Sequence, residues 1–244
     1  MSQPSATAAE PDFGPSLPQL LRRWLPRLAR WQQVLLVLAA GAIVAFVITA
    51  VYKTEAAKRT YVQTGSDAGK RGLEPLPFRF DYPGTLRITK PPGAYVQAER
   101  TVNGTLAARM RVSPIEIQPQ PGLISGYLPI AVVGLEREAA RTYKNYRLQF
   151  EGRSRVNIAE GYQFAFNAQL PQKNGSPRSL YGRTVIIPEP YDPEDPAKPY
   201  PPGQAPKRGV LIQLLATTLD TPALAQDIGD TGILKKPFRT FRFG

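Results

Sequence analysis

One segment near the N-terminus is apolar without interruption. After it, apolar and polar residues alternate with the periods of strands and helices, as in a folded domain. Residues 34–52 read VLLVLAAGAIVAFVITAVY, nineteen residues without a charge. At about 1.5 Å of rise per residue, such a helix covers most of a hydrocarbon core of roughly 30 Å. A cleavable signal peptide usually has an apolar region of only about 7 to 15 residues. We therefore expect a retained transmembrane helix, anchored by Val34, Leu35, Leu36, Val44, Phe46 and Tyr52.

Charges on the two sides of this segment give a modest preference for its orientation. Four arginines precede it, at positions 22, 23, 27 and 30, and Lys53, Lys58 and Arg59 follow it closely. A short tail rich in arginine favours a cytoplasmic N-terminus, because a long folded domain is translocated largely regardless of its charge. We expect residues 1–33 in the cytoplasm and the C-terminal domain outside it, at the cell membrane.

Two further patterns accompany the predicted span. Leucine and tryptophan recur at three- and four-residue steps around Trp24 and Trp31, which predicts an amphipathic helix in the headgroup layer. The alternative is a tail that only sets the topology. Within the span, Gly41, Ala45 and Thr49 lie four residues apart and form a small-residue face on which two copies of the helix could associate.

Behind the span, residues 53–74 are polar and unpatterned, which predicts a linker, and a domain follows over residues 75–244. Its opening alternates apolar and polar residues at Phe78, Phe80 and Tyr82, as a strand does. The segments 95–102 and 105–112 flank Asn103-Gly104, a strong signal for a two-residue hairpin.

The remaining pattern predicts one helix and a sheet. Residues 127–143 have apolar positions at helical spacing. Strand patterns return around Tyr146 and Tyr162, and residues 180–187 and 210–216 are apolar enough to be central strands covered on both sides. A short helix is predicted to open at Asp220-Thr221-Pro222, and a last strand contains Phe241 and Phe243. The fold class is therefore α+β, with helices framing an antiparallel sheet.

Composition removes several kinds of chemistry. The chain contains no histidine and no cysteine, which excludes a Ser-His-Asp triad, a Cys-His pair and a conventional zinc site. We identify no catalytic, cofactor or metal-binding residue. The formal net charge is +12, and such an excess favours anionic neighbours. The basic residues are scattered through the strand segments without a dense aromatic-basic run, so nucleic acid is not the favoured partner.

The densest acidic segment of the chain is a long proline-rich stretch, EPYDPEDPAKPYPPGQAPKRG, over residues 189–209. Its prolines and its place between two strands predict a semi-rigid loop. Its carboxylates lack the spacing of a calcium-binding loop. One reading is a partner-binding element, and the other is a solvated surface insertion. The candidate partner-binding residues are Tyr191, Asp192, Glu194, Asp195 and Tyr200.

Several motifs together resemble the PsbP-like family over residues 75–244: FRFDYP near the start, a central helix, GRTVIIP, GVLIQLLATT and the closing ALAQDIGDTGILKKPFRTFRF. The resemblance implies an α/β/α sandwich around an antiparallel sheet, in a membrane-anchored bacterial protein of accessory and binding type. It implies no catalytic residue and no cofactor. We expect a non-catalytic interaction module that binds an envelope protein or an anionic polymer. The alternative is a carboxylate-dependent hydrolase of envelope glycans.

Overall fold

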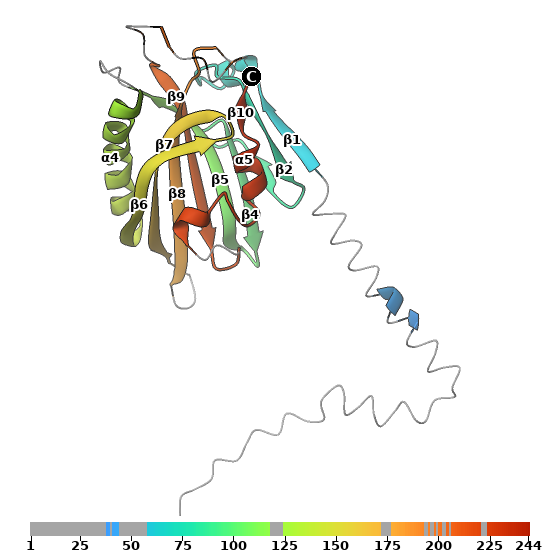
Figure 1. The fold of residues 1–244 in the computed structure, drawn as a ribbon. Helices are drawn as coiled ribbons and strands as arrows, with labels where there is room; N and C mark the ends of the chain where they lie inside the picture. The colour runs from blue at the N-terminus through green and yellow to red at the C-terminus, as the bar shows by residue number, and fades with distance from the viewer. Residues whose placement is uncertain are drawn as a thin grey trace, which may run out of the picture. The chain divides into compact units, whose positions relative to one another are not determined.

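The computed structural model describes residues 38–39, 41–43, 58–117, 124–171, 177–192, 195, 198, 200–201, 204, 206–220 and 224–244 (Figure 1). The chain divides into two units, Met1–Lys53 and Thr54–Gly244. In the first unit, the described residues Leu38, Ala39 and 41–43 are helical. No helix in the described part of the chain is long and apolar enough to cross a membrane. The rest of the predicted tail and span lies outside the described residues, including Trp24, Trp31, Val34, Leu35, Leu36, Val44, Ala45, Phe46, Thr49 and Tyr52.

The second unit is built around a seven-stranded antiparallel sheet with the strand order β3-β4-β5-β9-β8-β7-β6. Its strands are β3 (Arg87–Thr89), β4 (Val96–Val102), β5 (Thr105–Glu116), β6 (Lys144–Val156), β7 (Ala159–Leu170), β8 (Arg178–Pro188) and β9 (Arg208–Thr217). The predicted hairpin is confirmed: β4 pairs with β5 across Asn103 and Gly104, whose φ angles are 50° and 73°. The predicted central strands are also confirmed, since β9 and β8 lie side by side inside the sheet.

A second, three-stranded sheet lies against one face of the large sheet. Its order is β1-β2-β10, from β1 (Lys58–Gln63), β2 (Phe78–Pro83) and β10 (Arg242–Phe243). The prediction of a linker over residues 53–74 is therefore wrong for residues 58–69, which form a strand and a short helix. Lys58–Gln63 pairs with β2, and the helix α3 (Gly65–Gly69) follows, capped by the Thr64 side chain. The ordered domain thus begins at Lys58 among the described residues.

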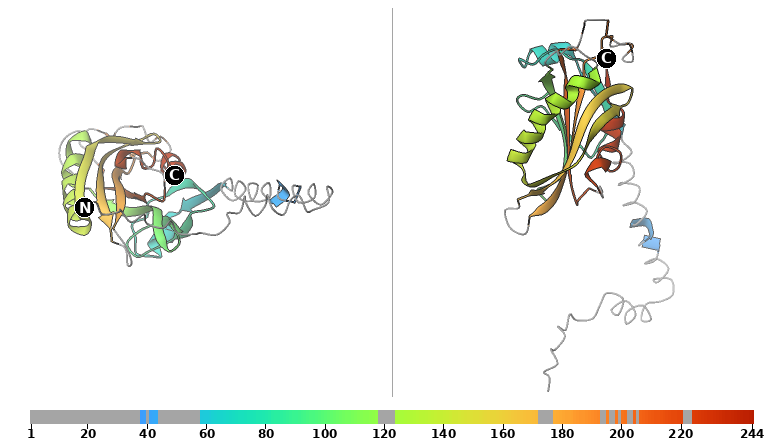
Figure 2. Two further views of the ribbon diagram at one scale, coloured as in Figure 1. Left: turned by 90° about the horizontal axis from the view of Figure 1, so that it is seen from below. Right: turned by 60° about the vertical axis from the view of Figure 1, so that its left-hand side comes forward.

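The two faces of the large sheet are covered differently (Figure 1, Figure 2). The helix α4 (Ile124–Thr142), predicted from its spacing, covers one face over β6 and β7. Leu128 and Val132 of α4 pack there against Phe164 and Phe166. The other face is covered by the small sheet. The α+β class is confirmed, but the predicted helix layer on this second face is replaced mainly by β1, β2 and β10.

The core between the two sheets is aromatic. Phe78, Phe80 and Phe241 are buried there together with Tyr95, and the Phe78 and Phe241 ring centroids lie 5.1 Å apart. Alternate residues of β8 point into the two cores: Val185 and Ile187 lie between the sheets, whereas Ile186 lies under α4. This explains the continuous apolar run in the sequence, because both faces of the strand are buried.

Two short helices close the domain. They are the 3₁₀ helix η2 (Ala225–Asp227) and α5 (Lys235–Arg239), which precedes β10. The helix predicted to open at Asp220 is placed differently. Thr221 and Pro222 lie outside the described residues, η2 begins at Ala225 after Leu224, and the Asp220 carboxylate accepts instead from the backbone N–H of Ile233.

Candidate functional site: a basic pocket beside α5

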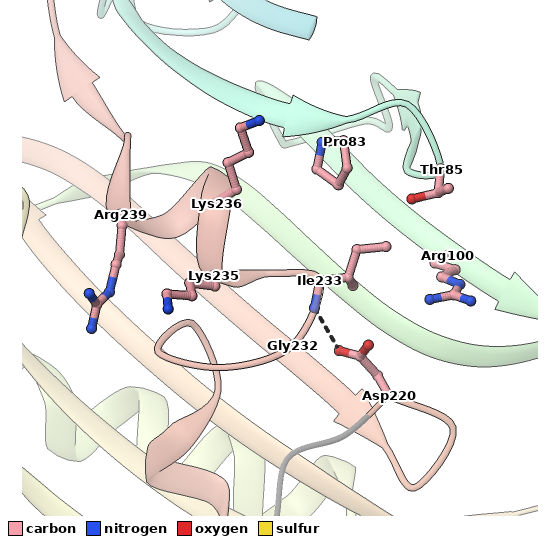
Figure 3. A pocket seen from close by; sticks show the side chains of 9 residues that line it. All are labelled: Pro83, Thr85, Arg100, Asp220, Gly232, Ile233, Lys235, Lys236 and Arg239. Atoms are coloured by element: carbon pink, nitrogen blue, oxygen red, sulfur yellow. Dashed lines mark hydrogen bonds between the residues drawn. The ribbon is translucent and has the colours of Figure 1, made fainter. Parts of the chain in front are cut away.

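A pocket of about 600 Å³ lies between α5, the end of β2 and the strand β4 (Figure 3). Four of its lining side chains are cationic and one is a carboxylate. Lys235, Lys236 and Arg239 come from α5, Arg100 comes from β4 on the opposite side, and Asp220 follows β9. The lining is completed by Pro83, Thr85, Gly232 and Ile233. The pocket lining therefore combines four cations with a single acid.

Tight turns bring α5 to this position. Gly229 and Gly232 have φ angles of +88° and +68°, which residues with a side chain rarely adopt. At Gly232, a Cβ atom would also lie only 2.7 Å from the Asp220 carboxylate. Phe238 on α5 is buried in the core between the sheets. The helix is thus held by its buried face, and its lysines are left to line the pocket.

A buried arginine fixes the segment from the other side. Arg183 on β8 donates from Nη1 to the backbone oxygen of Ile228 at 2.8 Å and to Asp230 at 2.7 Å. Its guanidinium also lies 4.7 Å from the ring centroid of Phe238. Asp230 in turn accepts from Arg239 at 3.0 Å. The pocket wall is therefore tied to the central sheet.

Asp220 is the buried acid of the pocket, with 7% of its surface exposed. Oδ2 accepts from the Ile233 N–H at 3.4 Å, and no other described residue donates to this carboxylate. Burial raises the pKa of Asp220, and the Ile233 hydrogen bond and the charge of Arg100 offset this only in part. A neighbouring hydroxyl, Thr85 Oγ1, is buried and has no hydrogen-bond partner among the described residues.

The pocket adjoins the place where the ordered domain begins. Lys58 pairs with Pro83 in the small sheet, and Pro83 lines the pocket. The Lys58 ammonium lies 2.9 Å from Asp81, whose pKa is lowered by the hydrogen bonds from Lys58 and Thr60 and further by the nearby charge of Lys236. Lys58 and Lys236 thus both lie near Asp81, beside the wall of the pocket.

The proline-rich loop predicted as a partner element is held together partly by its own side chains. Tyr191 and Tyr200 pack edge to face with centroids 5.5 Å apart, and Lys198 lies 3.1 Å from Asp192 and 5.7 Å from the Tyr191 ring. Asp195 is exposed. Glu194 lies outside the described residues. The structure therefore brings three of the five candidate residues, Tyr191, Asp192 and Tyr200, into one small cluster.

Ionic contacts anchor the base of this loop. Arg208 at the start of β9 donates to both carboxylate oxygens of Glu189, and to Glu74 at 2.8 Å. These hydrogen bonds raise the pKa of the Arg208 guanidinium. The Tyr200 hydroxyl donates to the Glu189 backbone oxygen at 2.8 Å. The base of the loop is thus fixed to the sheet, whereas Tyr191 stays exposed.

A second, smaller pocket of about 190 Å³ lies between α4 and the large sheet, lined by Arg109, Arg111, Leu135, Glu138, Ala139, Thr142, Tyr143, Phe164, Phe166, Thr184, Gln213 and Leu215. Glycoside hydrolysis by the usual mechanism needs two facing carboxyl groups roughly 5 to 9.5 Å apart. Each of the two described pockets contains one acid, Asp220 in the first and Glu138 in the second. Neither pocket offers the pair that the hydrolase alternative requires.

Comparison with known proteins identifies no relative by sequence: no known protein family and no curated protein matches the chain. Among solved structures, a protein of Bacteroides thetaiotaomicron is similar at a TM-score of 0.39 and 6% identity, over 76% of this chain and 48% of that one. Cyanobacterial PsbP (CyanoP) of Synechocystis is similar at a TM-score of 0.43 and 10% identity, over 77% of this chain and 92% of that one. At these values no family is assigned, and membership of the PsbP-like family stays a prediction from the sequence.

Proposed function

We propose that this chain is a membrane-anchored accessory module whose domain outside the cytoplasm binds an anionic component of the cell envelope in the basic pocket. The observation that carries the proposal is the imbalance of charge in the lining of that pocket, which has four cations and one carboxylate, with only Arg239 among the cations paired to a described acid, Asp230. Among the described residues, no ion pair involves Arg100, Lys235 or Lys236. Cations without a partner at a concave surface favour an anionic ligand.

The membrane part of the proposal is supported by the sequence. Residues 34–52 are long and apolar enough to span a bilayer, and the arginines before them favour a cytoplasmic N-terminus. A reporter fused after Gly244 tests this topology. An alkaline phosphatase fusion should be active, whereas a reporter that works only in the cytoplasm should be silent. The reverse pattern contradicts the proposed orientation.

The accessory role is supported by the residues the chain lacks. Without histidine and cysteine, the common nucleophilic and zinc-dependent mechanisms have no residues to act through. The proposal therefore assigns binding, without catalysis, to the pocket. A hydrolase remains the alternative function, and turnover of an envelope glycan by the purified chain would favour it.

Binding can be tested with the full chain reconstituted in phosphatidylcholine nanodiscs and a fluorescently labelled short polyphosphate as the anionic probe. The double variant Lys235→Gln/Lys236→Gln removes two pocket charges and should weaken binding by about tenfold and by at most roughly thirtyfold, since each exposed charge contributes up to about 1 kcal/mol. The matched control, Lys144→Gln/Arg155→Gln, removes the same charge from exposed positions on β6 and should change the Kd less than about twofold. Equal effects of the two double variants would contradict a role for the pocket.

A further inference from the structure

The acceptor inside the basic pocket restricts which anions fit. Asp220 is buried among the lining residues, and Arg100 lies near enough to influence its carboxylate. A phosphate or sulfate bound to the cations would meet this carboxylate and be repelled by it. A ligand with a donor group next to its phosphate turns the same carboxylate into a hydrogen-bond partner. Hydrogen bonds to charged groups are among the stronger ones in proteins.

Figure 3 shows both kinds of group in the lining of the pocket. The α5 lysines and Arg100 stand on opposite sides of the pocket, and Asp220 lies beside Ile233 between them. Oδ1 of Asp220 accepts no hydrogen bond from any described residue, since the Ile233 N–H is bound to Oδ2. The Thr85 hydroxyl on the same wall is also without a described partner.

We infer that the basic pocket binds a polyol phosphate, in which a phosphate group carries neighbouring hydroxyl groups as in the glycerol phosphates. The phosphate lies against the α5 lysines, Lys235 and Lys236, and a hydroxyl of the polyol donates to Asp220. This inference rests on the proposed function and names its ligand class. It also gives a role to Asp220, the one acid in the lining of a pocket that is otherwise basic.

Two sources of this chemistry exist at a membrane surface, the headgroup of phosphatidylglycerol and a polymer of polyol phosphates. The position of the pocket bears on the lipid source. Lys58 follows the end of the proposed span, Tyr52, by six residues, which reach at most about 20 Å when fully extended. Lys58 pairs with Pro83 in the pocket wall. The connection from the proposed span to this strand pair is therefore at most about 20 Å long.

Calorimetric titration of the full chain in phosphatidylcholine nanodiscs tests the ligand class. Glycerol 1-phosphate and methyl phosphate carry the same phosphate monoester, but only the first has neighbouring hydroxyls. We expect glycerol 1-phosphate to bind about tenfold more tightly, the difference that one charge-assisted hydrogen bond produces. In Asp220→Asn, the repulsion and the charged acceptor are both lost, so the two ligands should bind within about twofold of each other.

A second arm distinguishes the two sources. If the ligand is the lipid headgroup, phosphatidylglycerol in the nanodiscs should occupy the pocket, so that glycerol 1-phosphate no longer binds and Lys236 is shielded from acetylation. Nanodiscs with the same fraction of phosphatidic acid should have neither effect. If phosphatidylglycerol changes nothing while glycerol 1-phosphate still binds selectively, the polymer is the source. Equal affinity of the wild-type chain for both soluble phosphates overturns the inference and leaves the proposed function standing. Absence of any phosphate binding, together with no polyphosphate binding, overturns both.

Discussion

Nη1 of Arg183 lies 2.7 Å from Oδ2 of Asp230, and the side chain of Arg183 is only 8% exposed. The same nitrogen donates to the backbone oxygens of Gln226 and Ile228, and Nε donates to the Gln163 side chain at 2.7 Å. A single arginine on a central strand thus donates hydrogen bonds to two backbone oxygens and one carboxylate in the segment that leads from η2 into α5. It connects the stability of the sheet with the wall of the basic pocket.

We therefore expect Arg183→Met to lower the free energy of unfolding by about 2–4 kcal/mol, because it leaves two backbone carbonyls and the Gln163 amide oxygen without their partner. Urea denaturation of the full chain, followed through the near-ultraviolet signal of the aromatic core, measures this loss. Arg155→Met is the matched control on the exposed edge of β6 and should change stability by less than about 0.5 kcal/mol. A loss no larger than that of the control would show that the Arg183 contacts do not stabilise the domain.

Asp220 gives a pH dependence of defined sign. Burial raises the pKa of this carboxyl in the folded domain above its unfolded value of about 3.9. The folded state then binds the proton more tightly than the unfolded state. The stability that protonated Asp220 contributes is fully present below the unfolded pKa and is lost as the pH rises through the folded pKa.

The measurement is the unfolding free energy of the wild type minus that of Asp220→Asn, across a pH series. We expect this difference to fall with rising pH over the acidic range and then to level off. Asp81→Asn provides a control of opposite sign, because the hydrogen bond from Lys58 lowers the pKa of Asp81 in the folded domain. Its contribution should be present above the unfolded pKa and lost as the pH falls through the folded pKa. Parallel curves for the two variants would contradict the assignment.

The elements that the sequence predicted well are those that local chemistry specifies. Asn103-Gly104 adopts the positive φ angles that a tight hairpin needs, so the β4–β5 pair follows from two residues. The strand β1 was missed because KRTYVQ is mostly polar and turns only Tyr61 and Gln63 inward. Gln63 reads as a surface residue, yet its amide is buried, accepting from the Tyr61 hydroxyl and donating to the Thr64 carbonyl.

The basic pocket could not be predicted from spacing. Its residues come from positions 83–100 and 220–239, which are separated by more than a hundred residues and meet because β10 pairs with β2. The only local signal in the sequence was the pair Lys235-Lys236 close behind two glycines, Gly229 and Gly232. In the structure these glycines adopt positive φ angles in the turns that position the short basic helix α5. Unless the pairing of β10 with β2 is known, this sequence pattern cannot be distinguished from that of a basic turn exposed to solvent.

Gly182 on β8 makes a packing prediction. It lies opposite Phe166 of β7, and a Cβ atom at this position would lie 2.1 Å from the Phe166 ring. The ring has little freedom to move, since it is buried against Tyr143 and Tyr146 at centroid distances of 5.3 and 5.0 Å. Gly182→Ala should therefore cost about 1–3 kcal/mol of stability through overpacking, measured by thermal or urea unfolding.

Gly134 supplies the control for this substitution. It lies inside α4, and a Cβ atom there would have no atom within 4 Å. Gly134→Ala should stabilise the domain by about 0.5–1 kcal/mol, because alanine is the better helix former. If both alanines stabilise, the close approach of Phe166 to the backbone of β8 is not a constraint.

The last prediction concerns the proline-rich loop. Its flanking strands β8 and β9 are paired as far as Pro188 and Gly209, and the Glu189 N–H donates to the Arg208 carbonyl at 3.0 Å. A two-residue Asn-Gly turn can therefore replace residues 190–207. The contacts of Tyr191 with Tyr200 and of Lys198 with Asp192 are internal to the loop. The hydrogen bond from the Ile117 N–H to the Lys207 carbonyl is lost in the exchange.

We expect this replacement to change the free energy of unfolding by no more than about 1–2 kcal/mol, since two hydrogen bonds to the rest of the domain are removed, those of the Ile117 N–H and the Glu189 carbonyl, and a shorter loop costs less entropy to close. Binding of phosphates in the basic pocket should be unchanged, because no residue of the loop lines it. If the loop is a partner element, Tyr191→Ala in the full-length loop should weaken partner binding as the replacement does, because Tyr191 is its exposed aromatic. A loss of more than roughly 4 kcal/mol on replacement would mean that the loop is part of the core, since whole domains are stable by only about 5–15 kcal/mol.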